Sequence, residues 1–127
     1  MINISRLSKR IKKNEGFSNK IYQDKLGNPT IGYGHLILKK DKFVKNKTYT
    51  KKMLNNLFEK DLSIAIKHYE KIFSKNKFPT NIAEAMIEML FQLGLKNFIK
   101  FKKMISAFED LDIKKATEEM IKSKWYN

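Results

Sequence analysis

Cysteine is absent from this sequence of 127 residues, and only two histidines, His35 and His68, are present. The lack of cysteine excludes disulfide bonds and thiolate metal sites, so stability cannot depend on the redox compartment. Two histidines without cysteine argue against a structural zinc site.

Long apolar runs are also missing. No stretch approaches the roughly 18 residues needed to span a bilayer. The N-terminal residues lack the apolar core of about 7–15 residues that a secretory signal requires. The sequence thus predicts a protein without a transmembrane segment, made in the cytoplasm without an export signal of its own.

Acidic residues and arginine are scarce relative to lysine. The chain has 27 basic and 13 acidic residues, a net charge of +14, and Arg6 and Arg10 are its only arginines. Base-reading proteins rely on the bidentate fork of arginine, so no specific nucleic-acid partner is expected. The charge favours an anionic cell envelope as partner. A/T-rich codons would give the same lysine-rich composition whatever the function of the protein.

Glycine and proline are few and unevenly placed. Four of the five glycines lie between Glu15 and His35, where β-branched and aromatic residues predict short antiparallel strands. Most of the remaining chain has helical periodicity, with a lysine-rich connector at 39–47. The predicted fold is α+β, mainly α, with strands at 18–23, 30–33 and 35–38 and helices at about 4–15, 51–74, 82–93, 98–108 and 113–125.

Two carboxylates and a hydroxyl stand in the glycine-rich stretch. Glu15 is predicted at the C-terminal end of a helix, where the helix dipole is negative and favours a raised pKa. Asp24 and Thr30 flank the predicted turn at 27–29, close to opposite one another on a hairpin. A protonated and an ionised carboxyl group are what cleavage of a glycosidic bond needs. Spacing alone equally fits an ordinary helix end and an ordinary turn.

The spacing Glu15-x8-Asp24-x5-Thr30, with the Ile-Gly-Tyr-Gly-His run at 31–35, resembles the catalytic pattern of phage-type lysozymes. The similarity extends over nearly all of the chain, through segments 57–61, 91–94 and 122–127. It implies one lysozyme domain, 1–127, with a β-containing lobe at about 12–49. A helical lobe would comprise 1–11 and about 50–127, joined to the first lobe by a long helix.

The resemblance implies a bacteriolytic peptidoglycan hydrolase that cleaves between N-acetylmuramic acid and N-acetylglucosamine with inversion. Glu15 would be the proton donor, Asp24 the ionised partner and Thr30 the residue that holds the attacking water. The substrate-binding positions implied are Gly34, Leu36, Phe91 and Gln92. His35 matches a structural position, and the resemblance implies that no metal or cofactor is needed. The expected protein is a monomer, made in a host cytoplasm, that reaches the wall after the membrane is permeabilised.

The sequence departs from the family pattern in three respects. The segment between residues 38 and 50 is short, Met104 and Glu119 replace neutral hydrogen-bonding residues of the cleft, and the family's C-terminal helices are expected to be missing after Asn127. An inactive lysozyme remnant is therefore one alternative. A non-enzymatic cationic protein that binds membranes or cell walls is another, and a lytic transglycosylase a third.

Overall fold

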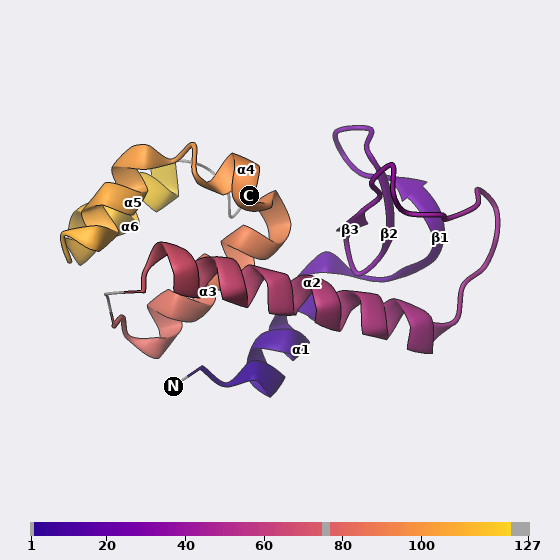
Figure 1. Ribbon diagram of the computed structural model, residues 1–127, viewed down its shortest axis with the longest axis horizontal. Coiled ribbons are helices and arrows are strands. Elements are labelled where there is room, and N and C mark those ends of the chain that lie inside the picture. The colour runs from indigo at the N-terminus through magenta and orange to yellow at the C-terminus, as the bar shows by residue number, and fades with distance from the viewer. Residues whose placement is uncertain (1, 75–76, 123–127) are drawn as a thin grey trace. The chain divides into compact units, whose positions relative to one another are not determined.

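The computed structural model describes residues 2–74 and 77–122 and divides into two compact units, Met1–Ile64 and Ala65–Asn127. Each unit is described by itself below. The elements are mostly helices, with one small antiparallel sheet in the first unit, so the predicted α+β fold is confirmed (Figure 1). The division into lobes predicted from the sequence stays a prediction.

Helix α1 (Ile4–Glu15) begins and ends as its sequence predicts. The Asn3 side chain accepts a hydrogen bond from the Arg6 N–H at 3.0 Å, which caps a first turn that has no acidic residue. The apolar residues Leu7 and Ile11, one turn apart, are fully buried. The chain leaves the helix at Gly16, whose φ of 73° is unfavourable for other residues. Glu15 is thus held on the last turn.

The sheet has three strands in the order β1 (Ser18–Gln23), β2 (Pro29–Gly32) and β3 (His35–Leu36). The strand pairing is antiparallel, with Tyr22 opposite Thr30 and Thr30 opposite Leu36. These three side chains form one row across one face, because directly paired residues point to the same side. Strand β2 begins one residue before the predicted strand, and β3 is two residues shorter than predicted.

The core of the first unit lies on the other face of the sheet. It contains Ile31, Tyr49 and Leu54, against which partly buried apolar side chains pack: Ile21, Ile37, Phe43 and Leu57. Complete burial of a side chain such as Ile31 contributes about 1.5–3 kcal/mol. Leu54 belongs to α2 (Lys51–Ile72), so this core fixes the sheet against the start of that helix.

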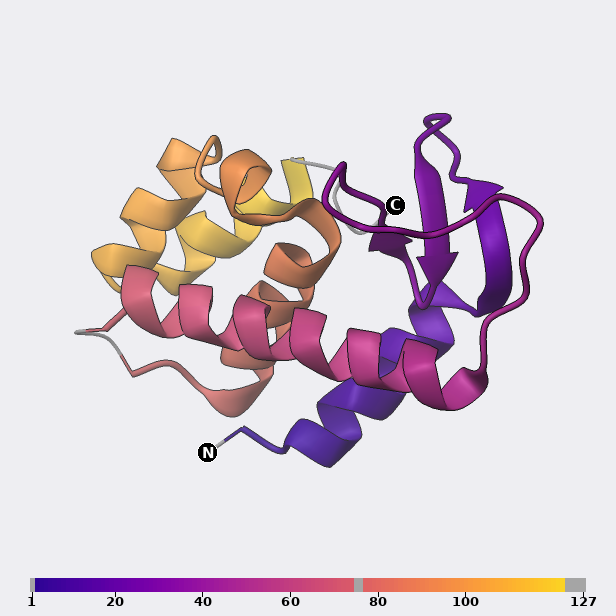
Figure 2. The same ribbon diagram turned by 45° about the vertical axis from the view of Figure 1, so that its right-hand side comes forward.

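The loop between β3 and α2 is the connector that the lysine-rich sequence predicts. It passes along β1, where the Tyr49 N–H donates to the Asn19 carbonyl at 2.9 Å (Figure 2). The Tyr49 hydroxyl accepts from the Val44 N–H at 2.7 Å. Phe43 stacks edge-on against Tyr49, whereas the Val44 side chain is 56% exposed. Phe43 therefore anchors the loop to the core, and Val44 does not.

In the second unit α3 (Thr80–Leu93) is buried on nearly every side, as its apolar sequence predicts. It begins after Pro79 and ends at Gly94, the two positions that favour a helix start and a helix end. Its buried side chains include Glu84 and Glu88. Beside it, three aromatic rings pack edge-to-face with centroids 5.5–6.1 Å apart: Phe73, Phe78 and Phe108.

The single helix predicted over 98–108 is wrong. The chain forms a short α4 (Leu95–Phe98), turns at 99–101 and continues as α5 (Lys102–Glu109). Phe98 and Met104 are both buried, and on one straight helix they would lie about 120° apart around the axis. The break lets both face the core. The last described helix, α6 (Ile113–Lys122), is capped by Asp112, and the rest of the helix predicted to 125 lies outside the described residues.

Candidate active site

Gly34 and the Glu15 carboxyl group are in close contact. A Cβ atom built on Gly34 would lie 3.0 Å from Oε2 and 3.1 Å from Cδ of Glu15. Gly34 also has a φ of 77°, which side chains other than glycine rarely adopt. The turn between β2 and β3 therefore supports the Glu15 carboxyl group with backbone alone.

Asp24 follows β1 and is held by the turn that the glycine-rich sequence predicts. Its Oδ1 accepts hydrogen bonds from the backbone N–H groups of Asn28 and Leu26, each at 2.9 Å. The N–H of Asn28 contributes most to a pKa below the usual value for aspartate. Backbone donors favour the charged form, so Asp24 stays ionised at neutral pH.

The Tyr22 phenol responds to the charges of both Glu15 and Asp24. Its side chain is 37% exposed, and its pKa is raised, first by partial burial and then by the negative charges of Glu15 and Asp24. Both carboxylates are thus near enough to the phenol to act on it. The phenol stays neutral and can donate a hydrogen bond over the whole neutral range. Sequence reasoning gave Tyr22 no role, although it lies in the predicted strand 18–23 directly before Asp24.

Thr30 occupies the middle of the row that Tyr22 and Leu36 complete. Its side chain is buried, and its hydroxyl donates to the Asn28 carbonyl at 2.9 Å. The strand register differs by two residues from the expected one, because Thr30 pairs with Tyr22 and not with Asp24. Thr30 and Asp24 are diagonal neighbours, which in a regular ladder lie about 7–8 Å apart. Asp24 itself lies in the turn beyond β1, so its closeness to Thr30 stays a prediction.

The other predicted substrate-binding residues are divided between the units. Leu36 lies in the first unit with its side chain 48% exposed. Phe91 and Gln92 lie on the last turn of α3 in the second unit, half-buried and exposed respectively. In that second unit Met104 and Glu119 line a common hollow of about 330 Å³. Met104 and Glu119, the two residues that replace neutral hydrogen-bonding residues of the family's cleft, therefore lie at the same hollow.

His35 is structural, as the resemblance implies. Its Nδ1 lies 2.7 Å from Asp61 of α2, and its Nε2 lies 2.9 Å from Asp41 of the loop. Burial lowers the pKa of His35, but the hydrogen bonds and charges of the two carboxylates outweigh it and raise the pKa. Burial likewise opposes ionisation of Asp41, yet the Leu38 N–H and His35 hold its pKa below the usual value.

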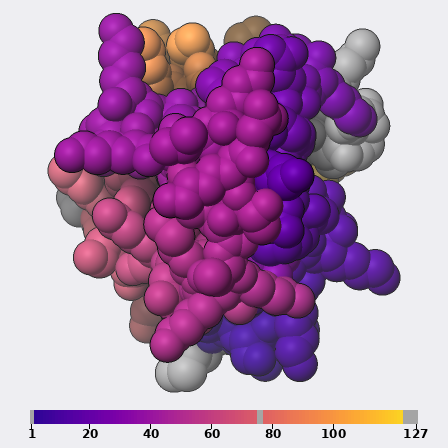
Figure 3. All heavy atoms as spheres, turned by 90° about the vertical axis from the view of Figure 1, so that its right-hand side faces the viewer, coloured from indigo at the N-terminus to yellow at the C-terminus, as the bar shows by residue number. Residues whose placement is uncertain are grey.

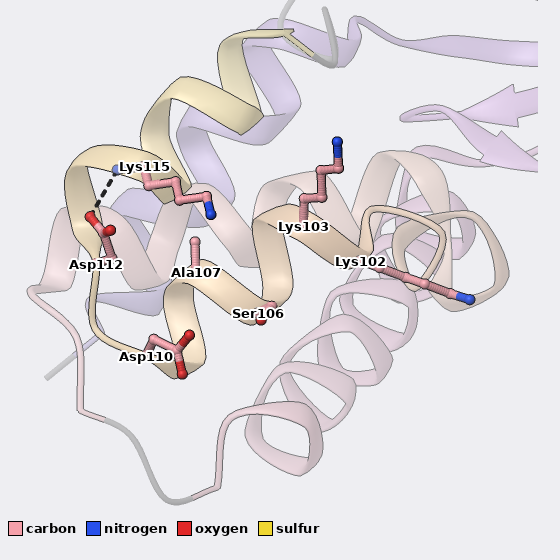
Figure 4. Close-up of a pocket in the computed structure, with 7 residues that line it drawn as sticks. All are labelled: Lys102, Lys103, Ser106, Ala107, Asp110, Asp112 and Lys115. Atoms are coloured by element: carbon pink, nitrogen blue, oxygen red, sulfur yellow. Dashed lines mark hydrogen bonds between the residues drawn. The ribbon is translucent and has the colours of Figure 1, made fainter.

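Outside this region, a hollow of about 300 Å³ lies between α5 and α6 in the second unit (Figure 4). Its charged side chains point in different directions, with Lys102 directed away from Lys115, and Asp112 caps the following helix. It lacks the converging polar groups of a binding site. Within residues 2–74 and 77–122, no three His, Asp or Glu side chains are grouped so that they could hold a metal ion.

The geometry of the first unit agrees with comparisons to known proteins. The sequence model of the phage lysozyme family matches residues 12–127. The chain belongs to the phage lysozyme family. It is 32% identical to the probable T4-type lysozyme 2 of Dictyostelium discoideum over 145 aligned residues, which cover 96% of this chain and 85% of that protein.

Two further relatives support the assignment. The probable T4-type lysozyme 1 of the same organism is 30% identical, with the same coverage. The pre-baseplate central spike protein Gp5 of Enterobacteria phage T4 is 30% identical over 94% of this chain but only 25% of its own length. The chain is accordingly a lysozyme (muramidase), a glycosidase with peptidoglycan as its substrate. None of its described helices has the length and apolar character needed to cross a membrane.

Proposed function

We propose that this lysozyme hydrolyses the β-1,4 bond between N-acetylmuramic acid and N-acetylglucosamine with inversion of configuration. Glu15 gives its proton to the leaving oxygen. Asp24 remains ionised and stabilises the positive charge that develops on the sugar ring. Thr30 holds the water that attacks from the opposite face of the ring, and Asp24 takes the proton that this water loses as the new C–O bond forms and the glycosidic C–O bond breaks. Gly34, Leu36, Phe91 and Gln92 contact the saccharide.

The contrast between the environments of the two carboxylates supports these roles. Asp24 receives two backbone N–H groups, which keep it charged. Glu15 lies at the negative end of α1, against Gly34, where its charged form gains nothing from the helix dipole. An acid and a base need such different surroundings to work at one pH. This contrast is the observation that carries the proposal.

Inversion requires room for water between the carboxylates, which are about 6.5–9.5 Å apart in inverting enzymes. The pKa of Tyr22 is raised by partial burial and also by the charges of both Glu15 and Asp24, and the effect of both charges supports the grouping of the two carboxylates at one site. The Thr30 hydroxyl donates its hydrogen to the Asn28 carbonyl, so its oxygen can accept a hydrogen bond from the attacking water, which supports the role proposed for Thr30.

The direct test is clearing of a peptidoglycan suspension by wild type, Glu15→Gln and Asp24→Asn. Glu15→Gln keeps the shape of the side chain but has no proton of the required acidity, so we expect a loss of at least about 100-fold. Glu59→Gln, an exposed change on α2, is the matched control and should clear normally. Equal clearing by wild type and Glu15→Gln would show that Glu15 is not the acid.

The product identifies the mechanism within the glycosidase class. Proton NMR of the fresh reducing end should show the α-anomer from a β-linked substrate. A retained β-anomer would exclude inversion, and a 1,6-anhydro product would identify a lytic transglycosylase.

The biological role that we propose is bacterial lysis: the enzyme is made in a host cytoplasm and reaches the wall once the membrane is permeabilised. Its expression with and without a permeabilising protein tests this role.

A second candidate function is disruption of anionic envelopes by charge alone. The loop and the first residues of α2 carry seven exposed lysines within 39–52, and these segments, purple to magenta, form part of the surface in Figure 3. The expected result for this function is killing that persists in Glu15→Gln and disappears at high salt. Killing that disappears in Glu15→Gln at low salt would leave the charge only an accessory role, that of attracting the enzyme to the wall.

A further inference from the structure

We infer that Lys12 is a positioning residue for Glu15, held in a cage of two aromatic rings and an amide. Its ammonium nitrogen lies 5.1 Å from the centroid of the Tyr33 ring and 5.0 Å from that of Phe58. It also donates a hydrogen bond to Oδ1 of Asn55 at 3.0 Å. The inference rests on the proposed role of Glu15 as the acid.

The cage joins three elements of the first unit. Lys12 belongs to the last turn of α1, Tyr33 to the turn between β2 and β3, and both Asn55 and Phe58 to α2. The rings of Tyr33 and Phe58 pack edge-on with centroids 5.5 Å apart, so the cation lies over two mutually supported rings. Ring faces attract a cation more strongly when water is partly excluded, and Lys12 is half-buried.

Two of these elements, α1 and the turn between β2 and β3, hold the Glu15 carboxyl group. Glu15 follows Lys12 by three residues, almost one helical turn, and so shares its face of α1. Tyr33 directly precedes Gly34, the residue against which the Glu15 carboxyl group lies. The ammonium group therefore ties the end of the helix that carries the acid to the turn that supports it.

Loss of the cation should displace Glu15 without removing it. A displacement of about 1 Å can cost about 100-fold in the rate of a positioned reaction, because the proton must be delivered along one line. Binding of the saccharide involves other residues, so affinity should change little. A positioning role thus predicts that kcat falls while KM is nearly unchanged.

The experiment compares Lys12→Met with Lys13→Met on soluble, uncrosslinked glycan strands. Both substitutions remove one positive charge from the same turn of α1, but Lys13 is exposed and has no cage. We expect kcat to fall about tenfold or more in Lys12→Met, with KM within about twofold of wild type. Lys13→Met should have both constants within about twofold of wild type.

Circular dichroism at the assay temperature establishes the folded fraction, and rates are expressed per folded molecule. If Lys12→Met does not fold, Asn55→Ala tests the cage from the other side with a milder change and should also lower kcat. Where both fold, the double variant should have a kcat no lower than Lys12→Met alone, because the two groups act through one contact.

The outcomes separate this inference from the proposed function. A kcat for Lys12→Met equal to that of Lys13→Met, in an enzyme that Glu15→Gln inactivates, would overturn the positioning role and leave Glu15 as the acid. A loss expressed only in KM, or independent losses in the double variant, would also overturn it. Full activity of Glu15→Gln would instead refute the proposed function itself.

Discussion

Replacing His35 with glutamine removes the imidazole that bridges Asp41 and Asp61 in the first unit. In wild type the side chain is 12% exposed and reaches Asp61 at 2.7 Å through Nδ1 and Asp41 at 2.9 Å through Nε2. Both nitrogens donate only when the imidazole is protonated. A neutral imidazole has one N–H, so one hydrogen bond is lost and a lone pair faces a carboxylate.

The direction of the pH dependence follows from the raised pKa of His35. The stabilisation is fully present below the unfolded-state pKa of 6.5 and is lost as pH rises through the higher folded-state pKa. Asp41, with a lowered pKa, adds stabilisation that is present above its unfolded-state pKa of 3.8 and is lost as pH falls below it. The cluster is therefore most stabilising between about pH 4 and pH 6.5.

The magnitude follows from two charge-assisted hydrogen bonds. Each contributes about 1.5–3 kcal/mol, and the cost of burying the imidazolium leaves a net value of about 2–3 kcal/mol for the pair. His35→Gln should therefore lower the free energy of unfolding by about 2–3 kcal/mol at pH 5.5 and by much less at pH 9. For a chain of this size the corresponding fall in Tm at pH 5.5 is about 10 °C.

Urea unfolding at several pH values between 5 and 9 measures the effect, with His68→Gln as the matched control. His68 is the only other histidine of the chain. Wild type and His68→Gln should lose stability in parallel as pH rises, while the stability of His35→Gln should stay nearly constant. A wild-type protein that becomes more stable from pH 6 to pH 9, or a His35→Gln variant with the wild-type pH dependence, would refute the reasoning.

Two further predictions concern the candidate active site. Gly34→Ala should reduce clearing of peptidoglycan at least about tenfold and destabilise the fold by about 1–2 kcal/mol. The reason is that the new Cβ atom would meet the Glu15 carboxyl group at 3.0 Å, at a residue whose φ is 77°. Gly27→Ala is the control: its φ is 82° but open space surrounds it, so it shares only the backbone penalty and should clear normally. Glu15→Gln should lower the pKa of Tyr22 toward its ordinary value without reaching it, because burial still raises the pKa after one negative charge is removed. Ultraviolet titration of tyrosinate measures this pKa, with the Tyr22→Phe variant used to identify the contribution of Tyr22. An unchanged pKa would contradict the placement of the phenol near Glu15.

Local signals in the sequence predicted much of the first unit. Asn3 lies where a helix needs a side-chain cap, and Gly16 lies where it needs to end. The turn at 27–29 predicted a hairpin. These features depend on a few neighbouring residues, so a single sequence contains them.

Features that depend on distant residues could not be predicted. The register of β1 against β2 depends on an irregularity between Ser18 and Tyr22, which has no sequence signal of its own. Nothing near His35 predicts its contact with Asp61, 26 residues later on another element. Helical periodicity likewise shows which residues are apolar but not where the axis turns between α4 and α5.

The positions proposed for chemistry and for recognition are distributed unequally along the chain. Glu15, Asp24, Thr30, Gly34 and Leu36 occupy 22 consecutive positions of the first unit, whereas Phe91 and Gln92 belong to the second. Under the proposed roles, substitutions in the second unit would change contacts to the saccharide and leave the proposed acid–base residues of the first unit untouched. For protein engineering, a library that fixes residues 12–36 and randomises exposed positions of 91–119 would search for new specificities among molecules that retain the machinery of cleavage.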